Sequence, residues 1–253
     1  MDLGLAGRAF VVTGGTRGIG RAIAEALVAD GARVIIGGRD QERAMAVATS
    51  IGSRDQVIGI GGDLAEPGTE TRLLGACAAA FGRIDGACIS TGGPETGGVT
   101  ELSDEQWLAA FSQTHLAVVR MARATAKAMT MEGGLLVVLS TSVREPIEGL
   151  ALSNGLRPGL AGVVGTLAQE LAARRIRVNG LLPGRIDTDR VRELDSASGR
   201  PAVVRRDWEK RIPLGRYGHP EEIGAAGAFL LSPAASYITG SLLTVDGGLT
   251  RSL

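Results

Sequence analysis

The sequence predicts an α/β Rossmann-type fold, a doubly wound, seven-stranded parallel sheet that forms a single domain over residues 1–253. Three observations support this prediction. Short apolar runs alternate with helical patterns along the whole chain. A cluster of glycines separates the first run from the first helix. The length suits one domain, and no repeat, linker or low-complexity segment divides it.

The expected elements follow from hydrophobic periodicity. A first helix is expected where Ile19, Ala22 and Ile23 recur at helical spacing, with Gly31 offered as its C-cap. Another is expected to begin at Ser103 with a capping box. The helical patterns between strands are long enough for right-handed crossovers. The predicted strands are Ala9 to Val12, Arg33 to Ile36, Val57 to Ile60, Ile84 to Ile89, Leu135 to Leu139, Arg177 to Leu181 and Leu242 to Val245.

Composition argues against several classes of partner. Basic and acidic residues balance at 27 each, so neither a nucleic acid nor a membrane surface is expected as a partner. No apolar run reaches transmembrane length and the N-terminus lacks signal-peptide features, so a cytoplasmic protein is expected. Cys77 and Cys88 lack metal-ligand spacing, which predicts two reduced core residues and no metal site.

The glycine cluster after the first strand predicts a dinucleotide site. The backbone must turn sharply there and approach a ligand closely, and the helix that follows points its amides and positive dipole end at a pyrophosphate. A strand, then glycines, then a helix near the N-terminus favours this interpretation over an ordinary turn. The candidate contacts are Gly14, Thr16, Arg17, Gly18, Ile19 and Gly20.

The end of the second strand favours NADP(H) over NAD(H). An acidic residue that would bind the ribose of NAD is expected at this point, but the chain has Gly38 followed by Arg39. Gly38 introduces no charge repulsion against a 2′-phosphate, and Arg39 and Arg17 can supply guanidinium groups to it. The alternative is that both arginines are solvated loop residues.

The spacing Gly14-x-x-x-Gly18-x-Gly20 resembles the short-chain dehydrogenase/reductase family. The segments Leu167-Ala168-Gln169-Glu170-Leu171 and Pro183-Gly184-Arg185-Ile186-Asp187-Thr188 extend the resemblance over nearly the whole chain. The resemblance implies an NADP(H) cofactor, a small-molecule substrate and a homotetramer or homodimer. It adds the cofactor contacts Asp63, Leu64, Thr91, Gly92, Gly93, Arg157, Pro183, Gly184, Ile186 and Thr188.

The resemblance also locates a catalytic region that departs from the family pattern. Counting back from Glu170 places the Lys of the family's Tyr-x-x-x-Lys on Arg157 and its Tyr on Ser153, typical of a divergent ketoacyl-reductase-like branch. The family's Ser falls among Ser140, Thr141 and Ser142, and its Asn falls on His115. The catalytic candidates are therefore His115, Ser140, Ser142, Ser153 and Arg157.

These replacements change the proton chemistry. A serine hydroxyl is a far weaker acid than a tuned tyrosine, and an arginine does not relay protons. Arg157 can still bind a ribose hydroxyl, a phosphate or a substrate carboxylate. His115 is the one carried-over group that titrates near neutrality, although a structural histidine is an open alternative.

Three functions stay open on the sequence. The first is an NADP(H)-dependent oxidoreductase that reduces a ketone or oxidises a secondary alcohol. The second is a non-redox cyclase, isomerase or lyase with a structural or absent cofactor, and the third is a non-catalytic subunit of a hetero-oligomer. The polar segment at about 188–212 is expected to be a mobile lid, and its Arg190, Arg192 and Arg205 hint at an anionic substrate.

Overall fold

The computed structural model describes residues 2–252, in which seven strands form one parallel sheet. The strand order is β3-β2-β1-β4-β5-β6-β7, and every neighbouring pair is parallel. This confirms the predicted doubly wound sheet. The strands are β1 (Ala9–Val12), β2 (Arg33–Gly38), β3 (Val57–Gly61), β4 (Gly86–Ile89), β5 (Gly133–Val138), β6 (Ile176–Pro183) and β7 (Leu242–Val245).

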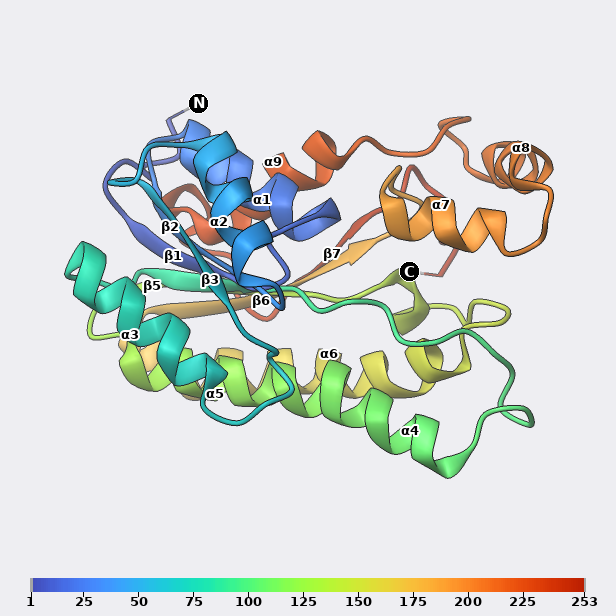
Figure 1. Ribbon diagram of the computed structural model, residues 1–253, viewed down its shortest axis with the longest axis horizontal. Helices are drawn as coiled ribbons and strands as arrows, with labels where there is room; N and C mark the ends of the chain where they lie inside the picture. Colours follow the sequence, from blue (N-terminus) through green and yellow to red (C-terminus); the bar gives the residue numbers. More distant parts are fainter. Residues whose placement is uncertain (1, 253) are drawn as a thin grey trace.

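Helices cover both faces of the sheet (Figure 1). One face carries α1 (Gly18–Ala29), α2 (Gln41–Ile51) and α9 (Pro220–Leu231), and the other carries α3 (Thr69–Phe81), α5 (Ala117–Ala128) and α6 (Ala151–Leu171). Two further helices, α7 (Asp189–Ser196) and α8 (Pro201–Arg211), lie beyond the carboxyl end of β6 (Figure 1). The segment from α4 (Asp104–Ala110) through η1 (Phe111–Leu116) leads into α5.

Each face of the sheet has its own core, because side chains alternate along a strand. In β1, Ala9 and Val11 pack into the cluster under α3, α5 and α6. Phe10 and Val12 pack into the opposite cluster with α1 and α9. All four residues are fully buried, as expected for a central strand of a parallel sheet.

The predicted strand boundaries are correct within a few residues. β1 and β7 match the prediction, whereas β2 and β6 run two residues further at their carboxyl ends, to Gly38 and Pro183. The predicted fourth strand begins too early, since Ile84 and Asp85 precede β4; the Asp85 carboxylate instead accepts hydrogen bonds from Arg8 and Arg83. The capping box at Ser103 is confirmed.

Both cysteines are buried and free, as predicted. Burial raises the pKa of the Cys77 and Cys88 thiols to about 12. Neither thiol is therefore activated as a nucleophile.

Candidate active site

A cavity opens where β1 and β4 lie side by side in the centre of the sheet. The strand order reverses at this point, so the loops after the two strands separate and leave a crevice at the carboxyl edge. The cavity has a volume of about 630 Å³. Its walls come from the glycine-rich loop, the loop after β4, the start of α6 and helix α7.

A pair of hydrogen bonds joins the two loops that form the crevice. The Thr13 hydroxyl donates to the carbonyl of Ser90 at 2.9 Å and accepts from the Ser90 amide at 3.0 Å. Gly14 has a φ of 58°, and a Cβ there would lie 2.7 Å from the Ser90 carbonyl oxygen. Glycine is therefore required at this position for both backbone conformation and space.

The end of β2 approaches the same loop. A Cβ on Gly38 would lie 2.4 Å from the Thr16 Cγ2 methyl, so the absence of a side chain lets the two segments meet. Arg17 and Arg39 both line the cavity beside this contact. Arg17 donates to Glu193 of α7 at 3.3 Å, whereas no carboxylate within residues 2–252 pairs with Arg39.

All the cofactor contacts expected from the sequence line this one cavity. One of them, Thr91, has a buried hydroxyl without a hydrogen-bond partner among the described residues. An unpartnered buried hydroxyl is costly, and a bound ligand would satisfy it. The lining set is Gly14, Thr16, Arg17, Gly18, Ile19, Gly20, Arg39, Asp63, Leu64, Thr91, Gly92, Gly93, Arg157, Pro183, Gly184, Ile186 and Thr188.

Hydroxyl groups and a buried guanidinium from the end of β5 and from α6 line the same cavity as the glycine-rich loop. Ser153 and Arg157, one helical turn apart on α6, both line the cavity, as does Ser140 at the end of β5. The Ser153 hydroxyl lies 3.0 Å from the hydroxyl of Ser142. Ser142 is not itself on the cavity wall, so it contacts the site through Ser153.

Arg157 carries a positive charge into a buried position. Its side chain donates to the carbonyls of Val138 and Leu139 at 3.1 and 3.0 Å, and the residue is 7% exposed. Burial, and then the nearby Arg190, lower its pKa to about 10. No carboxylate among the described residues pairs with it, so a cation faces the cavity without a counter-ion.

His115 does not join this group, which corrects the sequence-based placement. Its Nδ1 lies 3.1 Å from the Leu156 carbonyl and its ring stacks on Phe111, so it contacts α6 rather than the cavity. The helix is a π-helix from Phe111 to Leu116, and there Thr114 lines the cavity instead. The wider turn shifts the register by a fraction of a turn, which sequence spacing does not reveal.

Thr114 and Thr141 are two hydroxyl residues that line the cavity close to the catalytic candidates in sequence but are not among them. Thr141 lies between Ser140 and Ser142 in the chain, so the sequence already places it beside two catalytic candidates. Thr114 is adjacent to His115 and donates to the Ala110 carbonyl at 2.7 Å. Thr114 therefore occupies the cavity position that the sequence pattern assigns to its neighbour His115.

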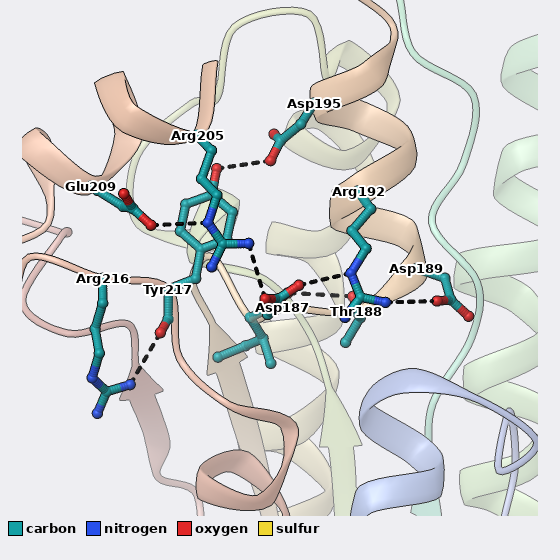
Figure 2. A network of polar contacts seen from close by, with 10 residues as sticks. Asp187, Thr188, Asp189, Arg192, Asp195, Arg205, Glu209, Arg216 and Tyr217 are labelled. Carbon is teal, nitrogen blue, oxygen red and sulfur yellow. Dashed lines mark hydrogen bonds and ion pairs between the residues drawn. The ribbon is translucent and has the colours of Figure 1, made fainter. Parts of the chain in front are cut away.

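Neither tyrosine of the chain reaches the cavity. Tyr217 is buried and donates to the Asp195 carboxylate at 2.9 Å, as Figure 2 shows. Tyr237 is fully exposed. The cavity therefore has hydroxyl groups of serine and threonine but no phenol.

Two of the three arginines expected to meet an anionic substrate are paired elsewhere. Arg192 and Arg205 both bind Asp187, at 2.9 and 3.0 Å (Figure 2). Neither residue lines the cavity, so that expectation is wrong for both. Arg190 does line it and donates to the Pro94 carbonyl at 2.7 Å.

Several residues of the cavity mouth were absent from the sequence-based candidates. Arg185 and Arg211 lie against the Trp208 ring, with guanidinium carbons 4.5 and 4.3 Å from its centroid. The sequence does not predict that these side chains meet, because the loop after β6 and helix α8 come together only in the folded chain. The omitted mouth residues include Glu145, Glu148, Arg185, Glu193, Trp208, Arg211 and Thr250.

Residues 2–252 contain neither a membrane-spanning helix nor a metal-binding cluster. None of their helices is long and apolar enough to span a membrane. No group of three or more His, Cys, Asp or Glu side chains in that range could hold a metal ion.

Comparison with known proteins agrees with this architecture. Residues 14–250 match the family model described as enoyl-(acyl carrier protein) reductase. The chain is 34% identical over 245 residues to the 3-oxoacyl-[acyl-carrier-protein] reductase FabG of Escherichia coli, covering 96% of this chain and 97% of the relative. It is 31% identical over 259 residues to the Chlamydia pneumoniae FabG, covering 99% and 100%.

Solved structures show the same similarity. L-sorbose reductase from Gluconobacter frateurii, solved with NADPH and L-sorbose, superposes with a TM-score of 0.94 at 28% identity over all of both chains. A Brucella melitensis short-chain dehydrogenase/reductase gives 0.92 at 29% identity, also over all of both chains. Together with the glycine-rich loop and the crevice between β1 and β4, these matches show that the chain is an oxidoreductase of the short-chain dehydrogenase/reductase family.

Proposed function

We propose that the protein is an NADP(H)-dependent reductase of a ketone, or in reverse a dehydrogenase of a secondary alcohol, with an unusual catalytic set. One observation carries this proposal: Ser153 and Arg157 share a single cavity with the complete set of expected cofactor contacts. The relatives support the reaction class, because the FabG proteins are named 3-oxoacyl reductases and the Gluconobacter enzyme is named a sorbose reductase.

The chain's own residues fit the cofactor. The glycine-rich loop and the start of α1 would hold the pyrophosphate, and Arg17 and Arg39 would bind the 2′-phosphate. The Thr91 hydroxyl, which has no hydrogen-bond partner among the described residues, would form a hydrogen bond with the cofactor at the loop after β4. The segment from Pro183 to Thr188 would hold the carboxamide end. The nicotinamide of a bound NADPH supplies the hydride.

Arg157 and Ser153 would stabilise the charge that develops on the substrate oxygen. Hydride addition to a ketone carbon places negative charge on the carbonyl oxygen, and a buried guanidinium interacts strongly with such charge. Ser153 can donate its proton to that oxygen while it accepts one from Ser142, 3.0 Å away. The proton that completes the alcohol then comes from Ser153, and water in the cavity, which Ser153 itself lines, would return a proton to the serine.

The absence of a phenol sets the expected rate. A positioned general acid contributes about 10²–10⁴-fold, whereas holding the two reactants together contributes about 7–11 kcal/mol. Serine hydroxyls and Arg157 therefore support slower reduction than a tyrosine would. We further propose that α7 and α8 form the substrate lid at about 188–212.

The test is NADPH oxidation with a panel of ketones and ketoacyl thioesters. We expect turnover that falls at least tenfold in Ser153→Ala and Arg157→Gln. Thr166→Ala is the control, because it removes a hydroxyl from an exposed position of the same helix. Tight NADPH binding without turnover of any carbonyl would contradict the proposal.

A gain-of-function variant makes the test sharper. Ser153→Tyr combined with Arg157→Lys would restore the family's acid and lysine, and we expect it to raise the turnover number by at least tenfold. An unchanged or lower rate in a folded, NADPH-binding double variant would show that the proton does not limit reduction.

A non-redox reaction is the second candidate, and the lack of a tyrosine in the cavity favours it. In that case the protein converts a substrate by isomerisation or elimination, and the rate of product formation is the same with the nucleotide bound and after it is removed. A rate that depends on NADPH and consumes it stoichiometrically would exclude this candidate.

A further inference from the structure

Helix α7 is bonded to both sides of the cofactor crevice. Glu193 accepts a hydrogen bond from Arg17 of the glycine-rich loop, with Oε1 and Nη1 3.3 Å apart. Arg190, one turn earlier, donates to the Pro94 carbonyl in the loop after β4 at 2.7 Å. The second carboxylate oxygen of Glu193 lies 3.9 Å from Arg190. Glu193 therefore lies between two cations and lines the cavity itself.

We propose that Glu193 competes with the 2′-phosphate of NADP(H) for Arg17 and so sets the affinity for the phosphorylated cofactor. This inference rests on the proposed function, in which Arg17 binds that phosphate. Two anionic groups cannot share one guanidinium without repelling each other. Arg39, the other cation at this site, pairs with no carboxylate within residues 2–252, so Glu193 holds one of the two phosphate ligands and leaves the other free.

The competition follows from the surroundings of the pair. Both side chains are about half exposed, at 44% and 54%, so the ion pair is weak and a doubly charged phosphate can displace it. Displacement releases the contact between α7 and the glycine-rich loop, while the Arg190 contact with Pro94 remains. Binding of NADP(H), but not of NAD(H), therefore removes one of the two contacts that tie α7 across the crevice.

The experiment compares Glu193→Gln with Asp189→Asn. Both variants remove one negative charge from α7 at the cavity wall, but Asp189 pairs with Arg192 and not with Arg17. Dissociation constants for NADPH and NADH are measured by fluorescence titration in low and high salt. We expect Glu193→Gln to bind NADPH about two- to fivefold more tightly at low salt, the range of an exposed ion pair, with no change for NADH.

The outcomes separate this inference from the proposed function. The competition is supported if Glu193→Gln increases the affinity for NADPH alone, if this increase is smaller in high salt, and if Asp189→Asn shows no such increase. An equal gain for NADH, or an equal gain in Asp189→Asn, overturns it while leaving the cofactor assignment intact. If the wild-type protein binds no NADPH at all, the proposed function itself fails.

Discussion

The hydroxyl of Tyr217 gives the most direct test of how α7 is held in place. The hydroxyl donates to Asp195 of α7 at 2.9 Å, and the second oxygen of that carboxylate accepts from Arg185 (Figure 2 shows the tyrosine contact). Tyr217 and Asp195 are 2% and 4% exposed, so water does not replace a lost partner. Tyr217→Phe removes only the hydroxyl that donates to Asp195 and keeps the aromatic ring. The guanidinium carbon of Arg205 lies 4.6 Å from the centroid of that ring.

The expected cost follows from this burial. A hydrogen bond to a charged group contributes about 1.5–3 kcal/mol, and the variant leaves one carboxylate oxygen without that donor. We expect the free energy of unfolding to fall by about 2 kcal/mol, which lowers the Tm of a chain of this size by about 4–8 °C. Urea unfolding followed by circular dichroism measures the change in the free energy of unfolding. Tyr237→Phe is the control, because the side chain of Tyr237 is fully exposed.

The pH dependence provides a second measurement. Burial raises the pKa of Tyr217 to about 12, above the value near 10 of an unfolded tyrosine. Between about pH 10 and 12 the unfolded chain loses this proton and the folded chain keeps it, so stability decreases as pH rises through that range. The decrease should be smaller in Tyr217→Phe. If Tyr217→Phe costs no more than Tyr237→Phe, Asp195 does not depend on the phenol and the reasoning is wrong.

Two further substitutions test close contacts. Gly38→Asp should weaken NADPH binding relative to NADH binding by at least about tenfold, because it adds a carboxylate beside the 2′-phosphate. The added Cβ would also lie 2.4 Å from the Thr16 methyl and displace it. An unchanged ratio of the two dissociation constants in titrations would contradict the phosphate site. Gly224→Ala places a Cβ 2.6 Å from the Ala22 carbonyl oxygen, between α9 and α1, and should cost about 1–3 kcal/mol in urea unfolding. Gly162→Ala, an exposed helical position with open space, should cost nothing, and equal losses in both variants would refute the packing argument.

The cofactor half of the site could be predicted from the sequence because its residues are consecutive or follow strands directly. Gly14 to Gly20 is one continuous segment, the loop after β1 and the start of α1, and the segments at Asp63, Thr91 and Pro183 each follow a predicted strand. Parallel strands end at the same edge of the sheet, so their following loops meet whatever the details of the core. All of these segments line one cavity, as this reasoning predicts for their loops, and their contacts with a cofactor stay a prediction.

The substrate half was predicted less well, since its geometry depends on helix register and on distant pairing. A π-helical turn directs Thr114, not His115, to the cavity. Arg192 and Arg205 looked available in the sequence, but Asp187 binds both.

The sequence by itself determined the alternation of strands and helices, the glycine-rich loop and the absence of a tyrosine at the catalytic spacing. These are properties of neighbouring residues, set by periodicity, backbone conformation and side-chain type. Only the tertiary structure decided which side chains share the cavity. Arg17 and Glu193 are 176 positions apart and meet only because α7 folds back over the loop after β1. Charge pairing across such a distance depends on the whole packed sheet, and no local pattern encodes it.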